Sequence, residues 1–254
     1  MIKLGSKEVT KIMKGSQEIS SAYKGSDKVW SSAAKTYSTN AITGYAGNRI
    51  IEVHGMPNVG AVTFETWFRI EESFPNQGLY SGVMGHINSS LNWAVMFNAG
   101  SPASGNRTLQ LMDMYHSDTY EFKRFTSSFP LTKWVHICLM ASGSSIYGFL
   151  DGKQCFTGST SHYYGYLAGK SVQMPGGCSH RDTAYGRYFD SRISNNLRYS
   201  TSSSGFTPPT APFEPDNNTL SLTNRGDEFI DYSSIGIVRR VGTSLSHDAA
   251  TPFV

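Results

Sequence analysis

The sequence predicts an all-β protein arranged as a β-sandwich, and three observations support this prediction. Residues 132–156 read as three strands joined by two tight turns, and residues 62–70 alternate between mostly apolar and mostly polar positions. The 254-residue chain contains 25 glycines and 10 prolines, and it has no long runs of Ala, Leu, Glu and Lys. Such a composition favours many short strands joined by turns over helices.

The segment 132–156 is the densest strand signal in the chain. Its first strand covers 134–140, and a Ser-Gly-Ser-Ser break at 142–145 separates it from a second strand at 146–150. Asp151-Gly152 follows, and this pair favours a type I′ hairpin turn because both central residues of that turn have positive φ. A third strand begins directly after the turn. A meander with one dense apolar strand is typical of the middle of a sandwich.

The strand at 62–70 is expected to bury one face and to expose the other. Successive side chains of a strand point to opposite faces, so the two parities are read separately. One parity is mostly apolar and consists of Val62, Phe64, Thr66, Phe68 and Ile70. The other parity is mostly polar and consists of Thr63, Glu65, Trp67 and Arg69.

The rest of the sandwich is expected to follow in short strands and loops. Residues 157–181 are predicted to form a long loop, and 206–219 to run extended over a surface or an edge, because proline cannot donate to a central ladder. The predicted strands lie at 82–87, 91–98, 108–115, 119–125 and within 186–200, with one or two closing strands in 219–242.

The first thirty residues form a ten-residue repeat. Gly5, Gly15 and Gly25 recur, each followed by serine, and each unit is predicted to be a glycine turn followed by one short strand. Three such strands bury too little apolar surface to be stable alone. We therefore predict that residues 1–30 are an anchoring or oligomerisation module; a plain extension of the sandwich is the alternative. The apolar residues expected to contact a partner are Val9, Ile12, Ile19, Tyr23, Val29 and Trp30.

The predicted domains are the repeat at 1–30, a small polar linker at 31–40 and the sandwich at 41–254. Composition also excludes several classes of function. The formal net charge of +3 is scattered, which argues against nucleic-acid binding. The chain contains no run of about 18 apolar residues, so no segment is predicted to insert into a membrane. The N-terminus does not resemble a secretion signal.

Three cysteines are present, and they are expected to be free thiols. An odd number of cysteines at wide spacing does not form a disulfide framework, and no Cys-x-x-Cys pair suggests zinc. No metal site and no cofactor are predicted. The residues concerned are Cys138, Cys155 and Cys178.

Several segments resemble one protein family in their order and spacing, namely 64–70, 132–153, 189–200, 206–213 and 228–234. They resemble the laminin G-like branch of the concanavalin A-like lectin/glucanase superfamily, and most closely the versions found in tailed-bacteriophage virion structural proteins. The proline segment FTPPTAPF and the later FIDYSS point to phages, as does the glycine-punctuated repeat at the N-terminus. The sequence departs from the family pattern at FDSRIS, where a glycine usually precedes the strand.

The resemblance implies a jelly-roll sandwich whose loops often bind carbohydrate, and two loop regions are candidates for that role. Tyrosine supplies amphipathic contact area at a small entropy cost, and the apolar face of a sugar ring stacks on such a surface. The alternative is that these rings pack under their loop or against a neighbouring subunit. The candidate ligand-binding residues are His162, Tyr163, Tyr164 and Tyr166 in one loop, and Tyr115, His116 and Tyr120 near a hairpin tip at 116–118.

Catalysis is not expected. Glucanases of the family carry an alternating Glu-x-Asp-x-Glu triplet on one strand, and this chain has none. Asp113 and Glu121 could meet across the hairpin at 116–118, but we interpret them as a solvated pair, and His136 as a packed structural histidine. Retaining glycosidases need two carboxyl groups about 5–5.5 Å apart in an accessible cleft.

These observations predict a non-enzymatic structural protein of a bacteriophage particle, assembled in the host cytoplasm. The repeat would tie it to other virion proteins or to copies of itself, making a homo-oligomer, and the sandwich would face outward to contact host-surface carbohydrate. One alternative is a decoration or cement protein of the capsid or tail that binds no glycan. A second alternative is a glycan-degrading enzyme.

Overall fold

The structure is a computed structural model, and it divides the chain into two units, Met1–Ser38 and Thr39–Val254. Each unit is described by itself. The described residues are 3–4, 7–8, 12–14, 17–19, 21–24, 27–31, 41–44, 51–70, 81–87, 92–98, 107–115, 119–160, 164–174, 176, 184–224, 233, 237–241, 246–248 and 252–253.

The N-terminal unit consists of three small antiparallel hairpins. In each hairpin the two strands flank one Gly-Ser pair of the repeat, with Leu4 opposite Lys7 and Ile12 opposite Ile19, for example. The expectation of a single strand per repeat is therefore wrong, because each unit supplies its own pairing partner. The strands are β1 (Lys3–Leu4), β2 (Lys7–Glu8), β3 (Ile12–Lys14), β4 (Gln17–Ile19), β5 (Ser21–Lys24) and β6 (Asp27–Ser31).

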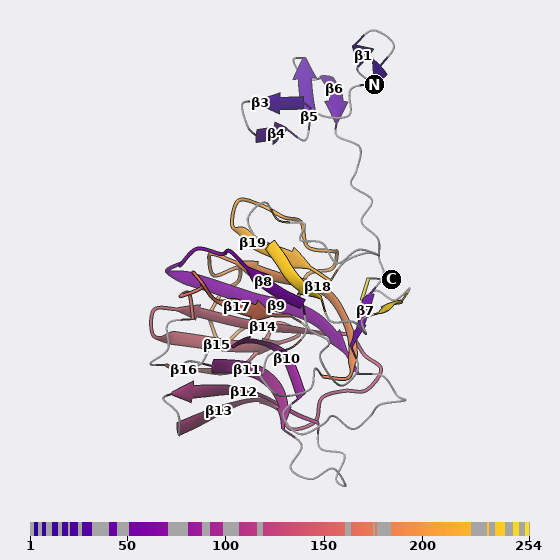
Figure 1. The fold of residues 1–254 in the computed structure, drawn as a ribbon. Coiled ribbons are helices and arrows are strands. Elements are labelled where there is room, and N and C mark those ends of the chain that lie inside the picture. Colours follow the sequence, from indigo (N-terminus) through magenta and orange to yellow (C-terminus); the bar gives the residue numbers. More distant parts are fainter. Residues whose placement is uncertain are drawn as a thin grey trace. The chain divides into compact units, whose positions relative to one another are not determined.

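The second unit is a sandwich of two antiparallel sheets, which confirms the predicted all-β jelly-roll class (Figure 1). One sheet has the strand order β13-β12-β11-β10-β17-β8-β20 and is called sheet E here. Its strands are β8 (Ile51–His54), β10 (Ser81–Ile87), β11 (Asn92–Asn98), β12 (Thr108–Tyr115), β13 (Thr119–Thr126), β17 (Ser171–Gln173) and β20 (Ile237–Val241).

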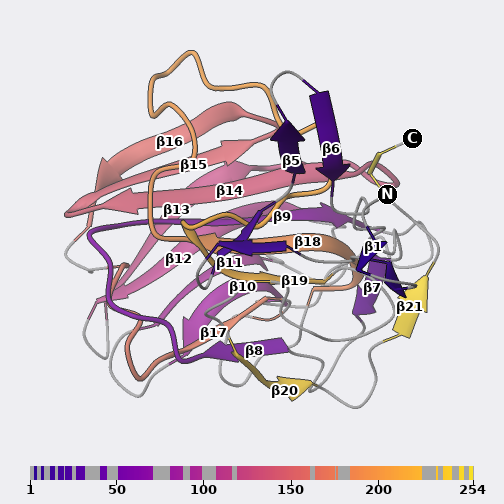
Figure 2. The ribbon, with the colours of Figure 1, turned by 90° about the horizontal axis from the view of Figure 1, so that it is seen from above.

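The other sheet, called sheet D, has the order β16-β15-β14-β9-β18-β7-β21, and β19 pairs with β18. Seen from above, β16, β15, β14, β9 and β18 follow one another in this order (Figure 2). Its strands are β7 (Ala41–Gly44), β9 (Ala61–Arg69), β14 (Val135–Ser142), β15 (Ser145–Leu150), β16 (Lys153–Ser159), β18 (Gly186–Ser194), β19 (Thr219–Thr223) and β21 (Ser246–Asp248).

The core lies between the two sheets and is rich in aromatic rings. Phe68 contacts the rings of Phe97, Phe129 and Tyr188 at centroid distances of 4.8 to 5.8 Å. All four side chains are fully buried. Aromatic contacts of this kind add to the free energy gained by burying their large apolar surface. The core therefore holds the two sheets at a fixed separation and positions the loops at their ends.

The central meander agrees with its prediction. Asp151 and Gly152 have φ angles of 47° and 72°, as a type I′ turn requires. The turn is also tied to β14, since the His136 amide donates to Asp151 Oδ1 at 2.8 Å. The long strands predicted from alternation are therefore present close to their predicted bounds.

Short strands were missed, and one strand differs from its expectation. β7 and β8 lie in 41–60, where no strand was predicted, and β17 lies inside the predicted 157–181 loop. β19 and β20 agree with the one or two closing strands expected in 219–242, and β21 lies beyond that range. β9 is buried on both faces, with Thr63 and Glu65 fully buried and Trp67 8% exposed. The predicted polar face of β9 is therefore not a solvent face.

Candidate functional site

A segment covers the outer face of sheet D and explains why β9 is buried on both sides. This segment, residues 195–218, is called the strap here. Its aromatic residue Tyr199 stacks on Phe206 with a ring-centroid distance of 3.8 Å and an interplanar angle of 5°. Phe213 is 3% exposed and lies under the guanidinium of Arg192, whose carbon is 4.1 Å from the ring centroid. The strap thus places apolar rings over the centre of the sheet.

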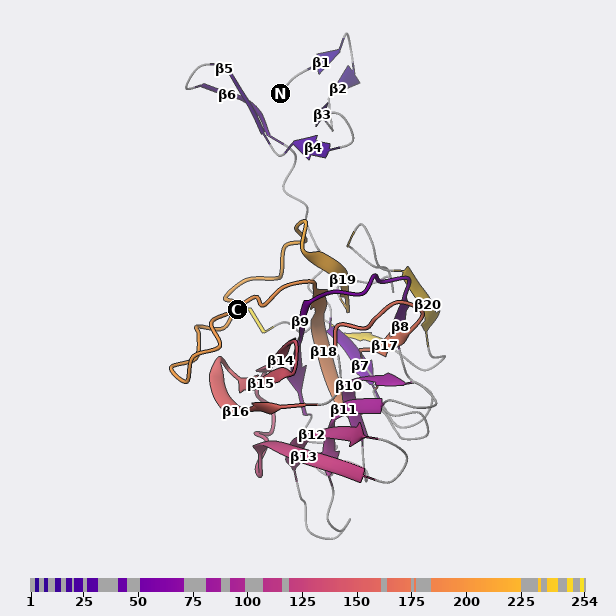
Figure 3. The ribbon, with the colours of Figure 1, turned by 90° about the vertical axis from the view of Figure 1, so that its left-hand side faces the viewer.

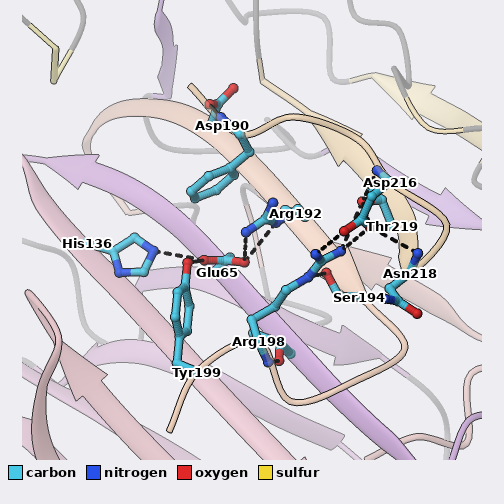
Figure 4. Close-up of polar contacts among 12 residues, drawn as sticks. Glu65, His136, Asp190, Arg192, Ser194, Arg198, Tyr199, Asp216, Asn218 and Thr219 are labelled. Carbon is cyan, nitrogen blue, oxygen red and sulfur yellow. Dashed lines mark hydrogen bonds and ion pairs between the residues drawn. The ribbon is translucent and has the colours of Figure 1, made fainter. Parts of the chain in front are cut away.

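Glu65 lies under the strap at the centre of a polar cluster (Figure 4). The Nε of Arg192 donates to Glu65 Oε1 at 2.8 Å, and the Nη2 atom of the same guanidinium is also 2.8 Å from Oε1. His136 Nε2 donates to Oε2 at 3.0 Å, and the Tyr199 hydroxyl donates to Oε2 at 2.7 Å. Three elements of sheet D and the strap therefore meet on one carboxylate.

The cluster keeps Glu65 ionised. Burial by itself raises the pKa of Glu65, but the hydrogen bond from His136 and the charge of Arg192 outweigh it and hold the pKa at about 2. The same carboxylate raises the pKa of Arg192, against the lowering effect of burial. Since Glu65 is fully buried and ionised, it has neither the access nor the proton that a general acid needs. We interpret it as a structural anchor.

Further polar contacts fix both ends of the strap. Arg198 binds Asp216 through two hydrogen bonds of 2.5 and 2.6 Å, and its Nε donates to Ser194 Oγ at 2.7 Å. The amide of Phe213 donates to Asp190 Oδ2 at 2.6 Å. The Arg198 contacts and the Asp216 cap on Asn218 are drawn in Figure 4. The predicted surface character of 206–219 holds only for part of the strap, since Phe213 is a buried anchor.

The outer face of sheet E is closed at its centre as well. Ala94 and Met96 are fully buried, and Met112 is 5% exposed. These three residues form one small apolar cluster on that face. The described central residues on the outer faces of both sheets are therefore buried, which leaves the loops at the ends of the sandwich as the candidate ligand surface.

The loops that join the two sheets meet at one end of the sandwich. Residues 55–60 connect β8 to β9, and 160–170 connect β16 to β17, so both cross from one sheet to the other. The turn between β14 and β15 joins them, because the Thr160 amide donates to the Ser144 carbonyl at 2.7 Å. This end lies at the left of Figure 1 and faces the viewer in Figure 3.

The loop 164–170 is held rigidly by its neighbour. The Val59 amide donates to the Gly165 carbonyl at 2.8 Å, and Asn58 Oδ1 accepts from the Ala168 amide at 2.8 Å. A Cβ atom at Gly165 would lie 2.0 Å from the Val59 carbonyl oxygen, so only glycine allows this close approach. The loop is thus fixed on the scaffold.

Tyr164 and Tyr166 have opposite roles in this loop. Tyr164 is 3% exposed, and its ring centroid lies 5.3 Å from that of Trp93, which in turn contacts Phe64 in the core. This differs from the expectation that Tyr164 faces a ligand, because its ring is part of the core packing. Tyr166 is 51% exposed, and Lys170 Nζ lies 5.4 Å from the centroid of its ring.

The two predicted tyrosine patches belong to the same end of the sandwich. Thr160 donates to Asp113 Oδ2 at 2.7 Å, which joins the loop before Tyr164 to β12, two residues before Tyr115. Tyr115 lies opposite Thr119, and Tyr120 opposite Met114, at the end of the β12–β13 ladder. His116, His162 and Tyr163 lie outside the described residues, as do Val9 and Cys178.

The interpretation of Asp113 and Glu121 as a solvated pair is wrong for Asp113. The two residues are opposite each other in register, but Asp113 is 4% exposed and accepts the Thr160 hydroxyl. Glu121 is exposed and pairs with Lys123 Nζ at 3.1 Å. Burial, with a further contribution from Asp113, raises the pKa of Tyr164 well above its usual value. The buried carboxylate thus belongs to the support of the loop.

The remaining predicted residues are placed as follows. Ile12, Ile19 and Tyr23 lie in β3, β4 and β5, and Val29 and Trp30 lie in β6. His136 is fully buried, Cys138 is a buried free thiol and Cys155 a partly buried one. Burial raises the pKa of Cys138 well above its usual value, so this thiol is unreactive.

Several residues of the site were missed from the sequence. Asn58 and Lys170 come from loops with no chemical motif. Only the group of tyrosines and a histidine in one loop pointed to the region. Glu65 and Arg192 carried a clearer signal, since each is a charge inside a segment of strong strand character. Two opposite charges placed that way predict a buried pair, because neither is tolerated alone in a core.

Within the described ranges, no group of three or more His, Cys, Asp or Glu side chains is placed to hold a metal ion. The part of the chain that the structure describes also contains no helix with the length and apolar character needed to cross a bilayer.

Sequence comparison assigns the fold to a family. A laminin G-like family model, described as the concanavalin A-like lectin/glucanases superfamily, matches residues 43–202, more than half of the chain. The chain belongs to this superfamily. No curated protein matches this superfamily member by sequence.

Several solved structures are similar to this chain at low sequence identity. A proposed carbohydrate-binding protein from Bacteroides ovatus is 11% identical with a TM-score of 0.58, covering 87% of this chain and 66% of its own. The native heptameric SAP-like pentraxin of Limulus polyphemus is 12% identical with a TM-score of 0.48, covering 84% and 93%. Tailspike protein 2 of an Escherichia coli O157:H7 bacteriophage is 10% identical with a TM-score of 0.44, covering 64% and 26%. The TM-score of the Bacteroides ovatus protein indicates a shared fold.

Proposed function

We propose that this concanavalin A-like protein is a non-enzymatic structural component of a bacteriophage particle that binds host-surface carbohydrate through the loop end around Tyr166. The observation that carries the glycan-binding part is the half-exposed Tyr166 ring on a loop fixed by Asn58 and Val59. A rigid exposed aromatic loses little entropy when a sugar ring stacks on it.

The polar groups around Tyr166 suit the same ligand. Lys170 Nζ lies over the ring, 5.4 Å from its centroid, and supplies a cationic donor next to the apolar surface of the ring. Binding sites commonly combine an apolar surface with a few placed polar groups. The superfamily includes lectins by its description, which supports carbohydrate as the ligand class.

The non-enzymatic part rests on the closed sheet faces. Glu65, the carboxylate at the centre of sheet D, is fully buried under the strap with a pKa of about 2. Asp113 is buried as well and serves the loop. A glycosidase needs an accessible acid and an accessible base or nucleophile beside its substrate.

The phage part rests on the sequence resemblance at FTPPTAPF and FIDYSS and on the N-terminal repeat. A particle that displays many copies binds a cell through avidity, so weak binding by each domain is sufficient. Labelling of purified phage particles by an antibody against residues 39–254 would support this location. Absence of labelling on the particles would contradict the virion role without affecting the glycan role.

The glycan role is tested with Tyr166→Ala and Tyr166→Phe on a glycan array and in a cell-adsorption assay. Tyr166→Ala should weaken binding at least about tenfold, because the stacking surface is lost, whereas Tyr166→Phe should retain binding. Both variants should unfold at the temperature of the parent protein, since Tyr166 is exposed. Binding by the parent and Tyr166→Ala alike would reject this site, and no binding by the parent would leave a decoration or cement role.

A further inference from the structure

β13 is an edge strand with one register shift, between Arg124 and Thr126. It is the terminal strand of sheet E, and none of the described strands pairs with its outer side. From Thr119 to Arg124 its register with β12 runs without a bulge, and the strand contains no proline. Edge strands are ordinarily blunted by bulges, prolines, charged side chains or short length, because an open ladder invites pairing with another chain. Glu121, Lys123 and Arg124 are such charges, so β13 can pair only in a register that sets opposite charges against each other.

The side chains of β13 alternate between the two faces of the sheet. Phe122 lies opposite Met112 on the outer face and is 47% exposed. Glu121 and Lys123 lie on the other face, at the rim where β13 meets β16, and they pair with each other at 3.1 Å. The exposed part of the strand is therefore a phenylalanine between two opposite charges.

We infer that two copies of the chain associate through β13, antiparallel and around a two-fold axis at Phe122. A two-fold axis perpendicular to a sheet keeps the outer faces of both copies on the same side. Directly opposed residues must then come from the same face, so the axis passes through one residue and not between two.

Charge restricts which residue can lie on the axis. With Phe122 on the axis, Glu121 of each copy lies opposite Lys123 of the other, and the two phenylalanines oppose each other. An axis at Glu121, Lys123 or Arg124 would place like charges directly opposite, which is destabilising. The pairing at Phe122 extends the existing Glu121–Lys123 pair into a network of four alternating charges.

The phenylalanine adds a reason to associate. A half-exposed aromatic ring on a sheet edge loses contact with water when the same ring of a second copy lies across from it. The association would join two seven-stranded sheets into one continuous sheet. This surface belongs to the sandwich and includes neither Tyr166 nor the N-terminal repeat.

The inference is tested with the full chain carrying Phe122→Cys, and Arg124→Cys as the matched control on the same face of the same strand. Only residue 122 faces its own copy across the axis, and opposed Cβ atoms lie about 4.5–5.5 Å apart. Under mild oxidation Phe122→Cys should form a disulfide-linked dimer at least about tenfold faster than Arg124→Cys. The parent chain gives the background from its three native cysteines.

Equal rates for the two variants, or no cross-link above the background, would overturn the inference. A faster cross-link by Arg124→Cys would reject this register. The readout is local, so association through the N-terminal repeat cannot imitate it. In a second test, Lys123→Glu should lower the Phe122→Cys cross-linking rate, and the double change Glu121→Lys with Lys123→Glu should restore it. If the double change fails to restore the cross-linking rate, pairing of Glu121 with Lys123 between copies does not set the register.

Discussion

At the scale of single residues, the molecule depends on a few buried charges that are fully paired. Glu65 receives hydrogen bonds from His136, Arg192 and Tyr199, none of which is on its own strand. Burying a carboxylate is costly unless such partners replace water. The cluster therefore specifies how the strap lies on sheet D, because any other placement would leave a buried charge without its partner.

Replacing Glu65 by Gln should destabilise the protein by about 3–5 kcal/mol, because Arg192 would remain buried without its counter-charge. Chemical denaturation measures this change in the free energy of unfolding. Glu121→Gln, which removes only an exposed ion pair with Lys123, is the control, with an expected change of about 0–1 kcal/mol. A loss for Glu65→Gln as small as that of the control would contradict the anchoring role.

Glu65 also gives the protein an acid-sensitive stability. Its pKa is lowered from 4.5 in the unfolded chain to about 2 in the folded protein, so the folded state favours the ionised form. The resulting stabilisation, about 3 kcal/mol, is fully present above pH 4.5 and is lost as the pH falls toward 2. Asp216, whose pKa is lowered mainly by Arg198, adds in the same direction.

Unfolding free energies measured between pH 7 and pH 2 should fall steeply below pH 4.5 for the parent protein. Glu65→Gln should show a shallower fall over the same range, because one of the titrating groups is gone. Parallel curves for the two proteins would show that Glu65 does not titrate as proposed.

At the scale of elements, the strap and the hairpin after β15 approach each other through two glycines. A Cβ atom at Gly152 would lie 1.8 Å from the Phe206 carbonyl oxygen, and one at Gly205 would lie 2.1 Å from the Gly152 carbonyl oxygen. Both glycines have positive φ. The Phe206 amide donates to the Gly152 carbonyl at 2.9 Å, so the strap continues the hydrogen bonding of the turn.

Gly152→Ala and Gly143→Ala form a matched pair that isolates this contact. Both glycines have positive φ, so alanine strains either turn by about 1–2 kcal/mol, but only Gly152 has backbone atoms of the strap against it. We expect Gly152→Ala to cost about 1–3 kcal/mol more than Gly143→Ala, measured by thermal or chemical unfolding. Limited proteolysis should also cut the strap of Gly152→Ala faster. Equal losses of unfolding free energy for the two variants would mean that the strap moves away from the added methyl group without destabilising the protein.

Long strands were predictable from the sequence, and short ones were not. β9, β12 and β14 carry eight or nine residues of clear pattern, and their bounds were found within a few positions. β8 and β17 have four and three residues, and they are strands because their neighbours pair with them. A segment of three or four residues carries too little periodicity to be recognised as a strand from the sequence.

The candidate site was only partly predictable for a related reason. Composition located the tyrosine-rich loop, but it could not show that Tyr164 points inward and Tyr166 outward, two residues apart. Likewise, the polar parity of β9 was read as a solvent face, because the strap that covers it is distant in sequence. The aromatic residues Phe206 and Phe213 within the proline-rich segment were the signal that this segment packs on something.

At the scale of the whole molecule, the sandwich and the N-terminal hairpins are separate units. The sandwich has its own aromatic core, closed sheet faces and a supported loop end. A chain of residues 39–254 should therefore unfold in one cooperative transition at the same temperature as the full chain, as measured by calorimetry. A lower unfolding temperature would show that the hairpins stabilise the sandwich.

The hairpins β1–β2, β3–β4 and β5–β6 each pair only within their own unit in the described part of the chain. Adding or deleting ten residues therefore leaves the hydrogen-bond register of every other unit unchanged. The N-terminal segment can therefore gain or lose complete ten-residue units during evolution. The same property makes it a convenient spacer for engineering, since its reach can be altered without redesigning the sandwich.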